Sequence, residues 1–180
     1  MTTEFDSWAI SDTHFGHQNV IKYDNRPFKN AAAMDNALIK NWNSVVKPND
    51  IVYHLGDFAF HAEDVVCNIL DQLNGRKILI LGNHDKVMRT DNVSKYFEKI
   101  TNYLEIYQDK QLICMFHYPI AEFNKAHRGA FHIHGHCHGN YKPHSPGRIM
   151  DVGANCINYT PINLKQVIRQ LEKEPILKHH

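Results

Sequence analysis

The chain has 180 residues, of which 43% are hydrophobic and 22% charged, and its formal net charge is +1. This composition excludes a disordered chain, and the length predicts a single domain spanning residues 1–180 with a proper core. The near balance of 20 basic and 19 acidic residues gives no strong sign of nucleic-acid binding. No apolar run approaches the roughly 18 residues of a membrane span. The acidic start of the chain and four cysteines without a C-x-x-C pair predict a cytoplasmic protein.

Histidine is the outlier of the composition. The sequence holds 14 histidines, and twelve remain if the terminal pair His179 and His180 is set aside as the remnant of a tag. A count of this size indicates metal or proton chemistry without saying which.

Short apolar runs, each followed by polar residues, predict strands over residues 8–10, 51–55, 77–81, 112–116, 130–134 and 148–152. Apolar residues at helical spacing predict helices over residues 31–46, 62–73 and 163–172, the last with Asn163 as its N-cap. Alternating strands and helices favour an α/β domain. In such sheets ligands bind beyond the carboxyl ends of the strands, and this is where the polar residues lie.

Five polar clusters follow five of these predicted strands. In chain order they are Asp12-Thr13-His14, Gly56-Asp57, Gly82-Asn83-His84-Asp85, His117 and Gly135-His136-Cys137-His138. In an extended chain, residues two apart point the same way, so Asp12 with His14, and His136 with His138, could each hold one ion. Carboxylate, amide and imidazole ligands suit Mn, Fe, Zn, Ni or Co better than Ca or Mg.

The candidate ligands are too many for one ion. Two ions that share a bridging carboxylate would use all seven, and such a pair can stabilise the attacking and leaving oxygens of a phosphoryl transfer. The seven candidates are Asp12, His14, Asp57, Asn83, His117, His136 and His138.

The ordered clusters D-x-H, G-D, G-N-H-D, a lone His and G-H-x-H resemble the signature of the calcineurin-like metallophosphoesterases. The stretches at residues 12–17 and 25–28 are also similar to a subgroup of small bacterial and phage phosphoesterases. The resemblance implies a four-layer α-β-β-α sandwich, in which two packed sheets are flanked by helices. It also implies two divalent transition-metal ions per chain, for which we expect Mn first, with Fe, Ni, Zn or Co as alternatives.

The same resemblance implies a role for each residue of the signature. Asp12, His14 and His138 would hold one metal, Asn83, His117 and His136 the other, and Asp57 would bridge the two. His84 would be the general acid for the leaving oxygen. Asp85 would hydrogen-bond to His84 and orient it.

Three further residues are candidate substrate contacts. His17 could bind the phosphate or only close the loop of Asp12. Arg26 could bind the phosphate with its guanidinium or form a surface ion pair. His127 could line the pocket. By contrast, His54, His132 and His134 are expected to be supporting residues, and His61 and His144 to be solvated loop residues.

The sequence therefore predicts a hydrolase of phosphate esters whose partner is a small phosphorylated substrate. Nucleotide-type phosphodiesters are favoured, while cyclic nucleotides, dinucleotide polyphosphates and nucleotide-sugar pyrophosphates stay open. A phosphomonoesterase of the same fold is the first alternative. A non-catalytic scaffold and a histidine-rich storage protein are the others, although the complete and ordered signature counts against both.

Overall fold

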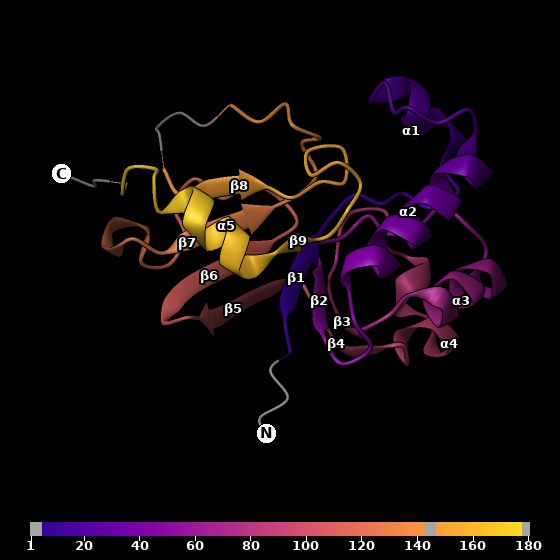
Figure 1. The fold of residues 1–180 in the computed structure, drawn as a ribbon, viewed down its shortest axis with the longest axis horizontal. Helices are drawn as coiled ribbons and strands as arrows, with labels where there is room; N and C mark the ends of the chain where they lie inside the picture. The colour runs from indigo at the N-terminus through magenta and orange to yellow at the C-terminus, as the bar shows by residue number, and fades with distance from the viewer. Residues whose placement is uncertain (1–4, 143–146, 178–180) are drawn as a thin grey trace.

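The computed structural model describes residues 5–142 and 147–177, which form two β-sheets with helices around them (Figure 1). The first sheet has the strand order β4-β3-β2-β1-β9. Its strands are β1 (Ser7–Ile10), β2 (Ile51–His54), β3 (Arg76–Ile80), β4 (Phe97–Thr101) and β9 (Ile162–Asn163). The first four strands are parallel and β9 pairs antiparallel with β1. The carboxyl ends of β1, β2 and β3 therefore meet at one edge.

The second sheet has the strand order β5-β6-β7-β8. It consists of β5 (Tyr103–Gln108), β6 (Gln111–Phe116), β7 (Phe131–His134) and β8 (Ile149–Asp151). The β5 and β6 strands form an antiparallel pair, whereas β6, β7 and β8 are parallel. The loop after β1 joins the two sheets through a bridge between Ser11 and Gly153.

The helices cover the first sheet and one side of the space between the sheets (Figure 1). They are α1 (Gln18–Tyr23), α2 (Ala31–Val45), α3 (Glu63–Gln72), α4 (Asp91–Ser94) and α5 (Leu164–Leu171), with the 3-10 turns η1 (Val87–Arg89) and η2 (Ala126–Arg128). Apolar residues of α2 and α3, such as Trp42 and Leu70, pack with Val52 and Leu79 of the first sheet.

A second core fills the space between the sheets. Leu55 and Ile80 on the first side meet Ile113 and Ile133 on the other, and Val167 of α5 joins them. The opposite face of the second sheet is covered by the 119–130 segment, where Phe123 packs with Cys114. Because side chains alternate along a strand, His132 of β7 lies on this covered face, where its Nε2 accepts a hydrogen bond from the Ile120 amide (3.0 Å).

The two-sheet α/β architecture confirms the expected fold. The six predicted strands and three predicted helices are present with shifts of one or two residues at their ends. The N-cap expected at Asn163 is also present, since its side chain accepts a hydrogen bond from the Lys165 amide. The sequence did not predict α1, α4, β4, β5 or β9. In β5, Tyr103, Glu105 and Tyr107 are exposed, so this edge strand lacks the continuous apolar run used to find the others.

Among the described residues, no helix is both long enough and apolar enough to cross a membrane. His144 lies outside the described residues. His61 was expected to be a solvated residue, and this prediction was wrong. Its ring Nε2 lies 2.7 Å from Asp35 Oδ2, and the other oxygen of Asp35 accepts a hydrogen bond from the Gly16 amide. The pair therefore holds the loop between β1 and α1.

Candidate metal centre

The seven candidate ligands are brought together by the loops that follow five strands. Asp12, Asp57 and Asn83 follow β1, β2 and β3 of the first sheet, and His117 and His136 follow β6 and β7 of the second. The two sheets therefore each supply part of one site at their carboxyl ends.

The backbone at this site is strained in a consistent way. The described residues include eleven with a positive φ that are not glycine, and five of these are candidate ligands with φ from 49° to 68°. They are Asp12, His14, Asp57, His136 and His138. Left-handed backbone costs free energy for residues other than glycine, so its concentration here points to a site where side-chain direction matters more than local stability.

Two glycines allow the loops to come close enough. A Cβ atom at Gly82 would collide with the carboxylate of Asp57, and one at Gly135 would collide with Ser11 and with the carboxylate of Asp12. Any larger residue at either position would push a candidate ligand out of place.

The first ligand set consists of Asp12, His14 and His138. One ligand atom from each lies within 4.8 Å of the others. Asp12 Oδ1 is 3.8 Å from His14 Nε2 and 3.6 Å from His138 Nε2. Asp12 and His14 are buried, and burial lowers the pKa of His14 to about 2, so its imidazole is neutral and its lone pair is available.

The second ligand set consists of Asp57, His117 and His136, whose ligand atoms meet the same distance criterion. His117 Nδ1 is 2.7 Å from the carbonyl oxygen of Leu55, which can only accept, so the ring proton must be on Nδ1. This leaves an unprotonated Nε2 that points at Asn83 Oδ1 (3.1 Å) and at Asp57 Oδ2 (3.6 Å). Three lone pairs facing one another are unfavourable unless a cation lies between them.

Asp57 lies between the two sets. Its Oδ2 atom is 3.8 Å from His14 Nε2 of the first ligand set and 3.6 Å from His117 Nε2 of the second. Its other oxygen, Oδ1, accepts a hydrogen bond from the His84 amide (2.9 Å), which fixes the carboxylate. One carboxylate oxygen is thus in reach of both sets.

Unsatisfied polar atoms provide an independent test of whether metals fit. Asp12 Oδ1 and both ring nitrogens of His14 are buried and have no hydrogen-bond partner among the described residues. Buried polar atoms are rarely left without partners, because each costs about 1–3 kcal/mol. The residues present therefore fit divalent cations, which would satisfy these atoms.

The first ligand set has a support that the sequence did not predict. Asp24 Oδ2 lies 2.6 Å from His138 Nδ1 and also accepts hydrogen bonds from Arg26 Nε and Nη2 (3.2 and 3.1 Å). Burial would lower the pKa of His138, but the hydrogen bond to Asp24 and the charge of Asp12 raise it overall. A carboxylate behind a metal-binding histidine orients the ring and increases its basicity. The signal that could have found Asp24 is its place two residues before Arg26.

A cavity of about 400 Å³ opens over the two sets. Candidate ligands form one part of its lining, and an apolar group made of Val20, Tyr23 and Phe60 forms another; the Phe60 ring lies 5.4 Å from that of His14. His17, Asp24 and His84 complete the lining.

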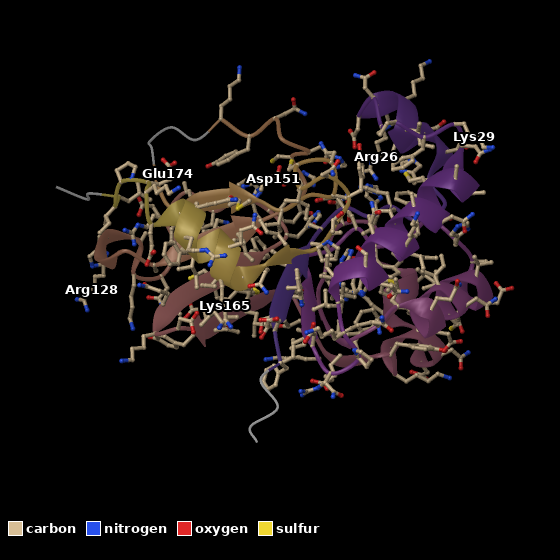
Figure 2. All side chains as sticks on the ribbon, viewed as in Figure 1. Arg26, Lys29, Arg128, Asp151, Lys165 and Glu174 are labelled. Carbon is tan, nitrogen blue, oxygen red and sulfur yellow. The ribbon has the colours of Figure 1, made fainter. Side chains whose placement is uncertain are left out.

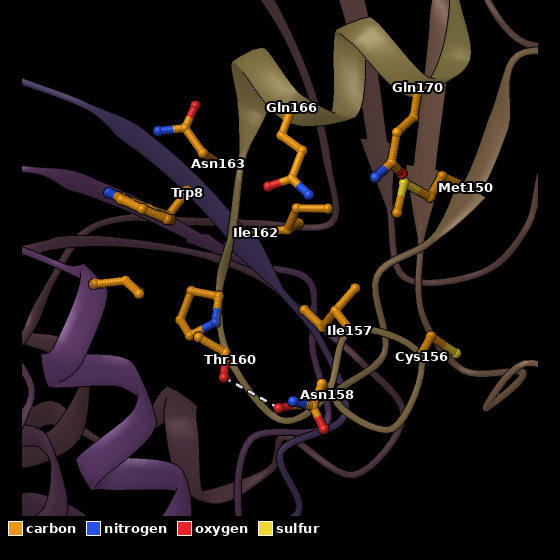
Figure 3. A pocket seen from close by; sticks show the side chains of 12 residues that line it. Trp8, Met150, Cys156, Ile157, Asn158, Thr160, Ile162, Asn163, Gln166 and Gln170 are labelled. Atoms are coloured by element: carbon orange, nitrogen blue, oxygen red, sulfur yellow. Dashed lines mark hydrogen bonds between the residues drawn. The ribbon is translucent and has the colours of Figure 1, made fainter. Parts of the chain in front are cut away.

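A second cavity of about 580 Å³ lies between α5 and the loop before β9 (Figure 3). Trp8, Ile157 and Ile162 form its apolar surface, and the amides of Gln166 and Gln170 extend toward it from α5. Among the described residues that line it, none is Asp, Glu, His, Lys or Arg. It therefore lacks the groups for phosphoryl chemistry, and the cavity over the ligand sets is the candidate active site.

Comparison with known proteins agrees with this site. The model of the calcineurin-like phosphoesterase superfamily domain matches residues 7–155. The chain belongs to the calcineurin-like phosphoesterase superfamily.

One relative covers nearly the whole length of this calcineurin-like phosphoesterase and another less than half of it. An uncharacterized protein of Methanocaldococcus jannaschii is 35% identical over 178 residues, which is 95% of this chain and 94% of that protein. The gene 66 protein of Mycobacterium phage L5 is 36% identical over 83 residues, or 44% of this chain and 40% of its own. The crystal structure of a protein of unknown function from Aquifex aeolicus aligns with a TM-score of 0.73 and 27% identity, covering 93% of this chain and all of that chain.

In this calcineurin-like phosphoesterase, the spacing of His136 and His138 would direct both side chains to one ion if the chain were extended. The structure instead places them in different ligand sets. His138 faces Asp12 and His14, whereas His136 faces Asp57 and His117. Both residues have left-handed backbone rather than extended backbone, so their side chains diverge. The division follows the roles that the family resemblance implies.

The role expected for Asp85 was wrong. Its carboxylate is buried and accepts hydrogen bonds from the backbone amides of Asp57 (2.9 Å), Phe58 (2.9 Å) and Gly82 (2.7 Å). No hydrogen bond joins it to His84 among the described residues. Asp85 therefore ties the loop after β2 to the loop after β3, and orients His84 only through the backbone.

Arg26 does not contact the cavity. Its side chain has no exposed surface, and its guanidinium donates to the carbonyl oxygens of Thr13 and Asp12 and to the carboxylate of Asp24. The guanidinium donors are used by groups of the protein itself, so the prediction that Arg26 binds the substrate phosphate was wrong. Arg26 instead fixes the loop that carries Asp12.

His17 and His127 have different outcomes. His17 lines the cavity and its ring stacks on Phe60, with ring centroids 4.0 Å apart. His127 is exposed in η2, which precedes the amino end of β7, whereas the site lies beyond the carboxyl end of β7. Figure 2 shows the adjoining Arg128 at the opposite end of the molecule from Arg26. A pocket role for His127 was therefore wrong.

Proposed function

We propose that this chain is a single catalytic domain that hydrolyses small phosphodiesters with two divalent transition-metal ions. The observation that carries the proposal is the position of Asp57 Oδ2, within 3.8 Å of His14 Nε2 and 3.6 Å of His117 Nε2. Two ions sharing that oxygen would satisfy the lone pairs of both ligand sets.

Asp12, His14 and His138 would hold one ion, Asn83, His117 and His136 the other, with Asp57 shared. When bound, the pair of ions would supply Lewis acidity and a water activated near neutral pH. The mixed oxygen and imidazole ligands favour Mn, with Fe, Ni, Zn or Co as alternatives.

His84 is the proposed general acid. Its amide donates to Asp57 Oδ1, so its backbone is fixed at the centre of the site, and its ring lies 6.1 Å from that of His14. The side chain is exposed in the cavity wall, so the ring can give a proton to a leaving oxygen and regain one from solvent.

The charge of the cavity favours diesters over monoesters. Among the described residues that line it, none is Lys or Arg. Apart from the two proposed ions and the proton of His84, the described lining therefore offers no cation to a second negative charge, so a phosphodiester with one charge is favoured over a monoester dianion. The alternative of a non-catalytic scaffold is disfavoured by the complete set of ligands with His84 beside them. We also propose a reducing, cytoplasmic location, because all four cysteines are free.

The test is to strip the protein of metal, reload it with Mn, Ni, Co or Zn, and measure both metal content and hydrolysis of an aryl phosphodiester and an aryl phosphomonoester. We expect close to two ions per chain and faster hydrolysis of the diester. His84→Ala should keep its metal and lose about 10²–10⁴ in turnover, the usual contribution of a general acid. His127→Ala, an exposed histidine remote from the cavity, is the matched control. A chain that binds no metal or hydrolyses neither ester would contradict the proposal.

A further inference from the structure

The apolar side of the active-site cavity has no role in metal binding. Val20 and Tyr23 come from α1, and Phe60 comes from the loop after β2. Tyr23 and Phe60 are 71% and 42% exposed. Single exposed aromatic residues are common, but these two line the same cavity together with the buried Val20. We call these three residues the apolar wall.

Phe60 is held rigidly in this wall. Its amide donates to the carbonyl oxygen of Phe15 (2.8 Å), next to a β-bridge between Phe15 and Ala59. Its ring stacks on His17 at 4.0 Å with an interplanar angle of 19°. The ring also lies 4.9 Å from that of His84. A group that leaves with a proton from His84 is therefore next to Phe60.

Tyr23 extends the same surface. The Tyr23 ring meets the edge of the His17 ring at 6.5 Å and 78°. Tyr23, His17 and Phe60 thus form a row of rings in the lining of the cavity.

The chemistry of the cavity is divided between its two sides. The ligand side can bind one phosphoryl group. Beyond it, the absence of Lys and Arg among the described lining residues leaves no cation for a further phosphate. Chains of phosphates are therefore a poor match, whereas a neutral planar ring can stack on the wall.

We infer that the apolar wall binds an aromatic ring carried by the phosphate ester, so that the site selects nucleoside phosphodiesters over alkyl esters and over pyrophosphate-linked compounds. This inference rests on the proposed function and names the substrate class of the same site. Tyr23 and Phe60 are then specificity-determining residues, and the phosphoryl group is bound independently by the ligand side.

The test measures binding of three probes to the metal-loaded protein: inorganic phosphate, ribose 5-phosphate and a nucleoside 5′-monophosphate. Stacking of a base on aromatic side chains should make the nucleotide bind about 5- to 100-fold more tightly than ribose 5-phosphate. Phe60→Leu and Tyr23→Leu keep apolar volume but remove the ring face, and each should reduce this ratio severalfold. Tyr107→Leu is the matched control, since Tyr107 is 65% exposed on β5, away from the cavity.

The outcomes separate this inference from the proposed function. If the nucleotide and ribose 5-phosphate bind equally, or if the ratio survives both substitutions, the aromatic assignment is overturned while the phosphate site stands. If inorganic phosphate and both sugar phosphates fail to bind to the metal-loaded protein, the proposed function and the inference both fail. A ratio lost in the two wall variants and kept in Tyr107→Leu supports the inference.

Discussion

The two ligand sets of the site use similar residues but differ in burial and support. In the first set, Asp12 and His14 are buried, and the His138 side chain is only 19% exposed and is backed by Asp24. In the second set, Asp57 and His117 are buried, whereas His136 is exposed, as is Asn83 beside it. The ring of His136 has ring contacts with His117 and Tyr118 but no hydrogen bond among the described residues.

This difference teaches that similar ligands need not hold metal equally. A preoriented ligand side chain loses little conformational entropy when it binds a metal ion. An anionic partner behind an imidazole makes the ring nitrogen a stronger metal ligand. We therefore expect the first ligand set to bind its ion more tightly, and the second to release its ion first and to be open to substrate.

The largest effect is expected when the carboxylate shared by the two sets is removed. Asp57→Asn keeps the shape of the side chain but removes the negative charge that reaches both ligand sets. Both sets should then bind metal weakly, and the difference in their metal affinity should disappear. We expect metal content to fall at both sets and turnover to fall by more than the ~100-fold that loss of an outer-shell partner costs. Elemental analysis and diester hydrolysis measure these two effects, and Asp64→Asn, at an exposed residue of α3, is the control. A variant with two ions and normal turnover would refute the shared role.

A smaller effect is expected from the support of the first ligand set. Asp24→Asn removes the negative charge behind His138, and metal affinity at the first set should fall about 10- to 100-fold. In a chelator titration, the wild-type protein should lose its two ions at two different chelator concentrations. In the variant these two concentrations should lie closer together. Asp35→Asn is a matched control, because Asp35 also pairs with a histidine, His61, that is not a ligand. Two unchanged steps in Asp24→Asn would show that the support does not set the difference.

The smallest effect is a loss of protein stability at low pH. This loss must be distinguished from the loss of metal at low pH when the two ligand sets are compared. Burial lowers the pKa of His132 to about 4, and this residue lies outside both sets. The unfolded chain takes up its proton below about pH 6.5, so the stability from neutral His132 is complete above that pH and is lost as the pH falls toward 4.

At pH 5 the metal-free protein should have lost on the order of 2 kcal/mol of its free energy of unfolding through this residue. His132→Gln keeps an acceptor for the Ile120 amide and should make stability less dependent on pH between 7 and 5. His127→Gln should keep the wild-type dependence. Denaturant unfolding at pH 7 and pH 5 measures the free energy of unfolding of each variant. If this free energy changed with pH in His132→Gln as it does in the wild type, His132 would not be the source of the loss.

Much of the fold and most of the ligands could be predicted because they depend on local sequence. Apolar runs located β1, β2, β3, β6, β7 and β8, and the polar residues behind five of these strands located the site. Three strands were missed. β4 and β5 mix charged or exposed residues into the apolar pattern, and β9 is only two residues long, so their pairing depends on neighbouring strands. Phe60 and Tyr118, which flank the site, gave no signal because a single aromatic residue after a motif is equally typical of a core.

The sequence alone determined which residues are available for chemistry and the order in which strands deliver them. Only the tertiary structure decided how they combine: His136 and His138 separate, Asp85 ties backbone amides, and Arg26 with Asp24 supports a ligand. The physical reason is distance along the chain. Asp24 and His138 are 114 residues apart, and the Asp12 carboxylate after β1 accepts a hydrogen bond from the His136 amide after β7, a contact that no local pattern encodes.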